Sequence, residues 1–450
     1  MMCAKSLRKD LRFSSIDSFL SNAMIGAGET FFPAFALALG ASQVTTAMVT
    51  ALPFLIGSSV QLAAPYLLER IGSYRRWMVL LGMIQALCFF PLIGMALWGP
   101  GVPITWVFAI VTLYWACGLS SGPAWNSWMA TLLPSKMRPK YLARRNHLGQ
   151  LGLVIGLVAG GCLLHFSKQA GYEHAAFAVL FLISGAARIG SSFSMHKQSE
   201  RPGSVRAQRR LSLKCVAKKV RGGGEAHLFY FLLILSAAVN ISSPFFNPFM
   251  LKQLSLSYAG YMGLIGMSFV AKIAAFSFLS KAAHNIDPFK LMRVGLVGVA
   301  IAPALWIFSG DYTFLLFAQI VSGIVWAVYE LGMTLVLFGV VKDEERTSVL
   351  SVFNFLTALM VLLGTTIGGR ILSDLGESSS TYFLLFGLSS AARLLTMILF
   401  DRAAESIAIE RARESRERIV PYVRPEEIAA QDAQPVAARR PAEERLGSVG

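Results

Sequence analysis

The chain of 450 residues has few charged side chains: Asp, Glu, Lys and Arg make up 15% of it, against 55% hydrophobic residues. A water-soluble domain of this composition would lack the polar groups to cover its surface, which indicates a membrane protein. The five cysteines are scattered singly, without CxxC or metal-ligand spacing, and the six histidines are dispersed. There is no Walker phosphate loop and no set of acid, base and nucleophile. We therefore expect no enzyme activity, no cofactor and no metal.

Long apolar runs fill most of the chain. A helix needs about 20 apolar residues to cross the hydrocarbon core of a membrane. Twelve such runs are present, with approximate limits 14–38, 43–68, 77–98, 103–131, 147–167, 174–195, 227–251, 257–280, 291–309, 313–340, 349–371 and 381–400. No small-residue cleavage site follows the basic N-terminus, so we expect an uncleaved first span. The sequence predicts an all-α integral membrane protein with twelve transmembrane helices.

The basic residues predict the orientation in the membrane. Most of the 41 Lys and Arg residues lie in the termini, the central loop and alternate short loops, while the opposite loops carry only Lys168 and Lys252. The positive-inside rule then places both termini in the cytoplasm of a multi-pass protein of the cell (inner) membrane. Topology explains the net charge of +16, so we expect the lipid bilayer, and no nucleic acid, as a partner.

The two halves of the chain repeat each other. Residues 138–161 align with 346–369, so that Arg138 meets Arg346 and Gly156 meets Gly364. Further matches pair "SGAAR", ending at Arg188, with "SSAAR", ending at Arg393, and "FFPAF" with "FFNPF". The repeat predicts two six-helix halves of parallel topology. We expect an N-terminal half at 1–196, a basic cytoplasmic linker at 197–226, a C-terminal half at 227–401 and a partly disordered cytoplasmic tail at 402–450.

One loop resembles a family signature. "PYLLERIGSYRRW", between the second and third runs, is similar to the G-x-x-x-D-R-x-G-R-R loop of the major facilitator superfamily, with Pro65 in place of the Gly. The matching residues, which form the predicted gating motif, are Glu69, Arg70, Gly72, Arg75 and Arg76. The resemblance implies two pseudo-symmetric six-helix bundles, transport by alternating access, and an acid, here Glu69, that seals the cytoplasmic side. It also implies that spans 1, 4, 7 and 10 line a central cavity.

Four glycines in the fifth run, Gly152, Gly156, Gly160 and Gly161, have two interpretations. Glycines four residues apart allow two helices to approach closely in lipid. The same pattern is similar to the antiporter motif of drug exporters, although Leu157 stands where that motif has a proline. We favour close packing and take the motif as slight support for export.

Charged residues at membrane depth cost at least ~2.5–3.5 kcal/mol on insertion scales, so each one needs an explanation. Glu29 lies in the first run and Glu330 in the tenth, where the family resemblance places the solute path. A carboxylate withdrawn from water can take up and release a proton near neutral pH, which a proton-coupled transporter needs. The alternatives are cation recognition and a structural ion pair. Lys272 can pair with Glu330 or bind an anionic solute.

The other charged residues in the spans are interpreted as structural. Arg188 and Arg393 occupy equivalent places, and we expect scaffold roles with stems that snorkel to the interface. Asp17, Arg370 and Asp374 are expected at the membrane interfaces. Pro33, Pro244 and Pro248 can kink their helices. Polar and aromatic residues predicted to contact solute in the cavity are Asn22, Thr30, Trp115, Asn126, Asn240 and Asn247.

These observations predict a monomeric secondary active transporter of a small organic solute. We expect coupling to protons at Glu29, and efflux rather than uptake, with proton-coupled import or uniport of a sugar or organic anion as the alternative. A transporter-like sensor or scaffold is a further alternative. The repeat places Ser243 at the position of Glu29, so the acid is present in one half only. Because the shared scaffold does not require this acid, Glu29 is the first candidate for function.

Overall fold

The computed structural model describes residues 4–41, 43–201, 203–205, 224–256, 258–282 and 287–419. The described residues form helices and turns without a strand. Most of the expected linker and the tail beyond residue 419 lie outside the described residues, so the domain boundaries predicted from sequence stay predictions.

The helices of the first half follow the order of the predicted spans, with short 3-10 turns at several ends. They are α1 (Ala4–Ala27), a turn at Glu29–Phe31, α2 (Phe32–Ala38), α3 (Gln43–Val60), a turn at Gln61–Ala63, α4 (Ala64–Ile71), α5 (Tyr74–Trp98), α6 (Ile104–Leu132), a turn at Ser135–Met137, α7 (Arg138–Gln169) and α8 (Glu173–His196).

The helices of the second half repeat this order. They are α10 (Gly224–Ser242), a 3-10 turn at Ser243–Phe245, α11 (Phe246–Pro248), a π turn at Phe249–Gln253, α12 (Tyr258–Ala282), α13 (Pro288–Phe308), α14 (Tyr312–Val340), α15 (Arg346–Leu375) and α16 (Ser379–Ile419).

Ten helical segments in the described part of the chain are long and apolar enough to cross a membrane. They correspond to the third to twelfth predicted spans. The first two predicted spans are not among the ten segments found in the described residues, and a 3-10 turn interrupts each of these spans, at Glu29–Phe31 and at Gln61–Ala63. The all-helical membrane fold is confirmed, while the count of twelve spans is met only in part.

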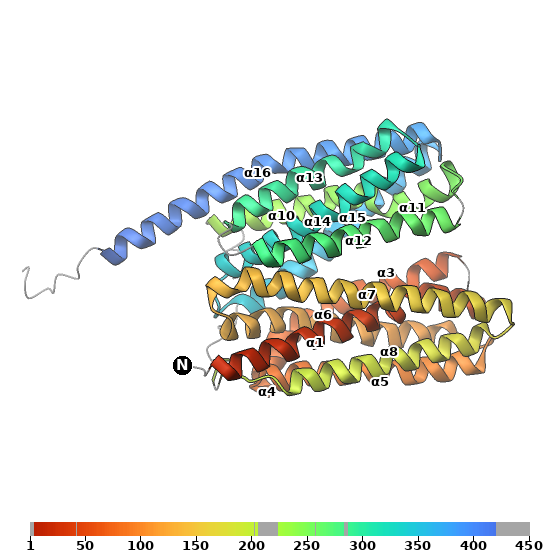
Figure 1. Ribbon diagram of the computed structural model, residues 1–450, viewed down its shortest axis with the longest axis horizontal. Coiled ribbons are helices and arrows are strands. Elements are labelled where there is room, and N and C mark those ends of the chain that lie inside the picture. The colour runs from red at the N-terminus through yellow and green to blue at the C-terminus, as the bar shows by residue number, and fades with distance from the viewer. Residues whose placement is uncertain are drawn as a thin grey trace, which may run out of the picture.

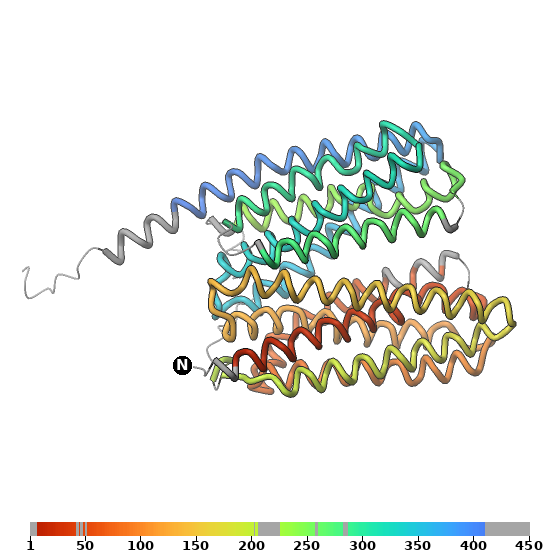
Figure 2. The backbone as a smooth tube through the Cα atoms, viewed as in Figure 1, coloured from red at the N-terminus to blue at the C-terminus, as the bar shows by residue number. Residues whose placement is uncertain are grey.

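The helices of the two halves lie side by side in two groups (Figure 1). The N-terminus and the outgoing helix α16 lie at the same end of the molecule, which we call the termini end, and the opposite end the distal end. The groups touch where α7 runs along α12 and where α15 meets α3 and α6 (Figure 2).

Among the described residues, the buried hydrophobic cluster that joins the two halves lies at the termini end. One cluster there joins Leu68, Tyr74 and Trp128 of the first half to Leu335 and Phe338 of the second. Toward the distal end each half has a cluster of its own, around Phe35 in the first half and around Phe249 in the second. The structure is therefore closed between the halves at the termini end.

Polar contacts reinforce this closure. The hydroxyls of Ser127 on α6 and Thr347 on α15 are 2.6 Å apart, and a ring nitrogen of His147 lies 3.0 Å from the carbonyl of Ile273. Arg138 donates to the carbonyl of Phe338 across the interface at 3.4 Å, with its guanidinium 5.3 Å from that ring's centre.

The internal repeat explains the arginine contacts. Arg138 donates to the carbonyls of Ala130 and Leu133, at the end of α6. Arg346, its equivalent, donates to the carbonyls of Phe338 and Val341, at the end of α14. Each arginine thus satisfies carbonyls that a helix end leaves without partners. Arg138 also donates to the other half, whereas the hydrogen bonds of Arg346 to described residues stay within its own half.

The glycines of α7 and α15 let these helices contact α1 and α10 at the backbone. A Cβ on Gly156 would lie 2.4 Å from the Ala23 carbonyl oxygen, and a Cβ on Gly364 would lie 2.2 Å from that of Ala237. These distances are shorter than any carbon–oxygen contact allows, so only glycine fits. Close packing, which we favoured from sequence, is confirmed at Gly152 and Gly156, whereas Gly161 faces open space.

The two α7 glycines provide a matched test of this packing. We expect Gly156→Ala to lower the melting temperature, because overpacking at such a contact costs about 1–3 kcal/mol. Gly161→Ala should leave it unchanged or raise it, since its Cβ meets nothing within 4 Å and alanine is the better helix former. Thermal unfolding of the purified variants measures both, and equal melting temperatures would contradict the packing account.

The termini-end closure can be tested by cross-linking. In a background without native cysteines, Ser127→Cys with Thr347→Cys should form a disulfide under mild oxidation, counted by gel shift with a maleimide polymer. Adding Arg138→Gln should slow the reaction roughly fivefold, as expected for about 1 kcal/mol from one hydrogen bond. Arg293→Gln, which removes an exposed ion pair with Asp401, is the control. A rate that Arg138→Gln leaves unchanged would show that Arg138 does not hold the halves together.

Candidate functional site

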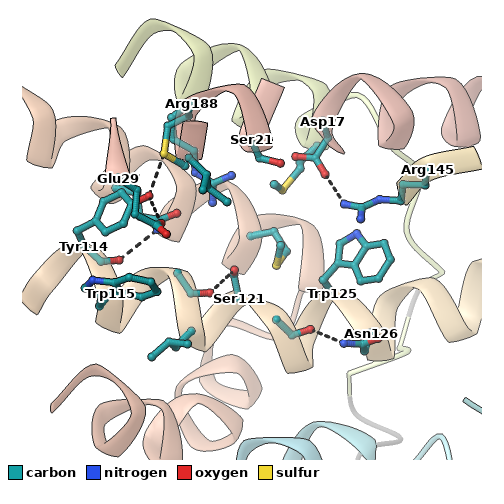
Figure 3. Close-up of a pocket in the computed structure, with 18 residues that line it drawn as sticks. Asp17, Ser21, Glu29, Tyr114, Trp115, Ser121, Trp125, Asn126, Arg145 and Arg188 are labelled. Carbon is teal, nitrogen blue, oxygen red and sulfur yellow. Dashed lines mark hydrogen bonds and ion pairs between the residues drawn. The ribbon is translucent and has the colours of Figure 1, made fainter. Parts of the chain in front are cut away.

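A cavity of about 350 Å³ lies inside the first half, between α1, α5, α6, α7 and α8 (Figure 3). Its lining combines two acids, two arginines, several polar groups and three aromatic rings. The lining residues are Asp17, Ser21, Met24, Ile25, Glu29, Met78, Gln85, Tyr114, Trp115, Gly118, Leu119, Ser121, Gly122, Trp125, Asn126, Arg145, Arg188 and Met195. Charge of both signs is therefore concentrated in one cavity of an otherwise apolar bundle.

Glu29 reaches the cavity because α1 stops just before it. Helix α1 ends at Ala27, and the chain continues through a 3-10 turn into α2, which has Pro33 in its first turn. A Cβ on Gly28 would lie 2.6 Å from the Ser184 hydroxyl, so the residue before Glu29 must be small. The helix is interrupted just before Pro33, and the half-buried Glu29 side chain, in the interruption, lies in the cavity wall.

Tyr114 holds the Glu29 carboxylate. Its hydroxyl donates to Oε2 of Glu29 at 2.7 Å and lies 2.9 Å from the sulfur of Met24. The Tyr114 ring is 1% exposed and packs edge-on against Phe32 and Phe89. Because this packing fixes the ring, the hydroxyl is a preorganised partner for Glu29.

A second network surrounds Asp17. Arg145 donates to one carboxylate oxygen of Asp17 at 3.1 Å, and the Ser191 hydroxyl donates to the other at 2.7 Å. Ser191 in turn accepts from Arg188 at 2.9 Å. The Arg145 guanidinium lies 4.0 Å from the centre of the Trp125 ring, a cation–π contact. Asp17 is thus buried in the bundle and shared between two arginines, which agrees with a structural role, while its place at the membrane interface stays a prediction.

The two arginines that the repeat makes equivalent have different environments. Both are buried, Arg188 with 4% and Arg393 with 2% of its surface exposed, so the prediction that they snorkel to the interface is wrong. Arg393 donates to the carbonyls of Val239 and Val299 and to the Ser242 hydroxyl, which agrees with a scaffold role. Among the described residues, Arg188 donates to the Ser191 hydroxyl, and the Nε of each of the two arginines has no acceptor. The reason is local, because Arg188 borders a cavity.

Glu330 forms an ion pair with Lys272, the partner that we considered from the sequence. The ammonium of Lys272 on α12 donates to Oε1 of Glu330 on α14 at 2.7 Å, with both side chains partly buried. A buried pair of this kind is neutral as a unit, which removes most of the cost of placing each charge in the bundle. Neither residue lines the cavity of the first half.

The structure brings three of the nine predicted binding residues to this cavity, namely Glu29, Trp115 and Asn126. Asn22 and Asn240 donate to carbonyls of their own helices, at Ser18 and Ser236. Thr30 donates to the carbonyl of Ile25, and its side chain, like that of Asn247, is exposed.

Wall residues that sequence reasoning did not predict include Tyr114, Trp125 and Arg145. Arg188 was predicted, but as part of the scaffold and not of a cavity. A tyrosine beside Trp115 in the fourth span gave a weak signal for Tyr114. Arg145 looked like one more positive charge of a cytoplasmic loop, because nothing in its local sequence shows that α7 already begins at Arg138.

The predicted gating motif forms the end of α4 and the start of α5. Gly72, with φ of +68°, ends α4 in the left-handed region that favours glycine. The Arg70 guanidinium lies 4.4 Å from the centre of the Tyr66 ring. Glu69 is exposed on α4, which packs against α15.

Glu200, which follows α8, is the acid that caps α5. Its carboxylate accepts from the Ser73 hydroxyl and from the Tyr74 amide, each at 2.5 Å. The Arg75 amide lies 3.4 Å from the same carboxylate, and the Ser73 hydroxyl accepts from the Arg76 amide at 3.1 Å. An acid at a helix N-terminus is favoured by the helix dipole. The sequence reasoning missed Glu200, because it lies 124 residues after Arg76.

Within the described part of the chain, no group of three or more His, Cys, Asp or Glu side chains is placed to hold a metal ion.

Comparison with known proteins finds a family model for part of the chain and solved structures of the same fold. Residues 226–441 match the family model described as Major Facilitator Superfamily. No curated protein matches the chain. Solved structures share the fold over 88% of this chain and 99% of their own. They include a bacterial homologue of the iron transporter ferroportin in an outward-facing state (TM-score 0.66, 14% identity) and the fucose:proton symporter of E. coli (0.68, 11%). A third is the human organic anion transporter MFSD10 (0.62, 14%).

The family model covers the second half, and the signature-like loop lies in the first half. The structural similarity extends over most of the chain and includes both halves. The second half of the chain therefore matches the Major Facilitator Superfamily, and most of the chain shares the fold of these solved transporters.

Proposed function

We propose that the chain is a proton-coupled transporter of a small organic solute and that Glu29 binds the coupled proton. One observation carries the proposal: Glu29 is a carboxylate at a helix break, in the wall of a charged cavity, where the equivalent residue of the second half is Ser243.

The contacts of Glu29 suit both protonation states. The Tyr114 hydroxyl donates to the charged carboxylate, and after rotation of its proton it can accept from the neutral acid. Arg188 lines the same cavity wall from α8, so a guanidinium group lies near the carboxyl group of Glu29. A proton can thus bind and leave without a loss of packing around the ring of Tyr114.

Alternating access provides the movement. The halves share a core and polar contacts at the termini end and have separate cores at the distal end. With the predicted topology, in which the termini are cytoplasmic, this arrangement is outward-facing. Transport then requires the contacts of Arg138, Ser127 and Thr347 across the interface to break as the halves rock.

The evidence for the direction of transport is weaker than the evidence for the proton site. The glycine pattern of α7 supported export, and the contacts of Gly152 and Gly156 with α1 explain two of these glycines by packing alone. The solved relatives include a protein described as a proton symporter. Uptake is therefore the second candidate direction.

Transport assays test the proton site. The solute is first found as the compound that most raises the melting temperature of the purified protein, because a ligand that binds the folded state stabilises it. In proteoliposomes, a gradient of one pH unit should move this solute to about a tenfold difference in concentration if one proton is coupled. With Glu29→Gln, the flux should become independent of the gradient while exchange of solute continues.

Two acids serve as controls. Glu330→Gln removes a carboxylate whose charge Lys272 already balances, and Glu173→Gln removes an acid paired with the exposed Lys168. Both variants should keep the response to the pH gradient. A response that survives Glu29→Gln would exclude Glu29 as the coupling site, and a parent protein that ignores the gradient would indicate a uniporter.

A further inference from the structure

The charges of the first-half cavity do not balance once Glu29 carries a proton. Asp17 is one negative charge between two guanidinium groups, those of Arg145 and Arg188. Glu29 supplies the second negative charge. Protonation of Glu29 therefore leaves the group with one positive charge in excess.

Within the described residues, Arg188 is the arginine of this pair that has no direct carboxylate partner. Asp17 bonds Arg145 directly and reaches Arg188 only through Ser191. The groups that face Arg188 are Asp17 from α1, Glu29 from the turn after α1, and Tyr114 and Cys117 from α6. Tyr114 and Cys117 are neutral near neutral pH. When Glu29 is protonated, Asp17 is the one charged carboxylate left among these groups, and it already forms an ion pair with Arg145.

The guanidinium also has unused donors. An arginine has five N–H donors, and the described residues provide one acceptor, the Ser191 hydroxyl. Glu29 and Arg188 both line the cavity and face each other, and they form no direct ion pair within the described part of the chain (Figure 3). By contrast, Arg393 in the second half bonds two backbone carbonyls and a hydroxyl. Arg188 alone of this equivalent pair is available to a ligand.

We propose that the cavity binds one anionic group of the solute, a carboxylate or a similar oxyanion, on Arg188 at the same time as Glu29 binds a proton. This inference rests on the proposed function, since it assigns Glu29 the same proton. A buried cation without a partner is costly, so the proton and the anion each make the other's binding more favourable. The indole rings of Trp115 and Trp125 in the same wall favour an aromatic or apolar body on the solute.

Joint binding has a consequence for direction. A proton and an anion that occupy the cavity together cross the membrane together, so an inward proton gradient drives uptake. This is the opposite of the export predicted from the glycine pattern.

Thermal stabilisation by aromatic acids tests the proposal with defined probes. The purified full-length protein is titrated with benzoate, phenylacetate or indole-3-acetate at pH 6 and pH 8, and with the corresponding amides. At least one acid should stabilise the parent protein more at pH 6 than at pH 8, with an affinity that changes by up to about tenfold per pH unit, the limit for one linked proton. The matching amide should have little effect.

Variants separate the two groups. With Arg188→Gln the acid should lose its advantage over the amide, and with Glu29→Gln, a neutral mimic of the protonated acid, binding should be tight at both pH values. Because Arg188 is buried, each variant is compared with and without ligand, and Arg188→Lys, which keeps the charge, should retain part of the effect. Arg370→Gln, which removes an exposed ion pair with Asp374 at the distal end, is the control.

Three results would overturn the proposal. If no acid stabilises the protein beyond its amide, or if Arg188→Gln binds acids as the parent does, the anion site is wrong while the proton site on Glu29 still stands. If an acid binds through Arg188 equally at pH 6 and pH 8, the joint binding is wrong, and the pH-gradient assay of Glu29→Gln decides separately whether the proton site stands.

Discussion

The burial of Arg188 is the constraint on which the candidate site depends. A guanidinium inside a membrane bundle needs negative charge or hydrogen-bond acceptors around it, because neither lipid nor apolar side chains can replace its hydration. In the second half, Arg393 meets this need with backbone carbonyls. In the first half, Arg188 meets it through Ser191, Asp17 and the facing carboxylate of Glu29. One half of the repeat therefore holds its arginine as scaffold, while the other holds it beside a cavity.

The same asymmetry relates the scaffold to the proposed mechanism. The close contact between α7 and α1 fixes the first helix, and its break after Ala27 turns Glu29 toward the cavity. At the termini end, the two halves share a hydrophobic core and hydrogen bonds. The site thus lies within one half, and in the proposed mechanism the interface between the halves is the part that rearranges during transport. This separation of binding from movement suits a carrier that exposes one site to either side of the membrane in turn.

Much of the fold was predictable from the sequence, because hydrophobic length and internal repetition are strong signals. The repeat correctly related the helix breaks near Glu29 and Ser243. It also related the glycines of α7 and α15, and the ion pair between Lys272 and Glu330 followed from the need to balance charge. The cavity was less predictable, since Asp17, Arg145 and Arg188 are separated by more than forty residues at each step. Equivalent placement suggested equal roles for Arg188 and Arg393, whereas roles depend on neighbours that only the packed structure supplies.

The central claim is that a proton on Glu29 and an anion on Arg188 bind together. Proton uptake on ligand addition tests it most directly. The purified protein, in weakly buffered solution near neutral pH, receives a pH-matched aromatic acid that stabilises it, and the change in pH is converted to protons bound. The account predicts uptake of up to one proton for each anion bound, and none with Glu29→Gln, although the variant still binds the anion. Binding of the anion without proton uptake by the parent protein across pH 6 to 8 would contradict the account.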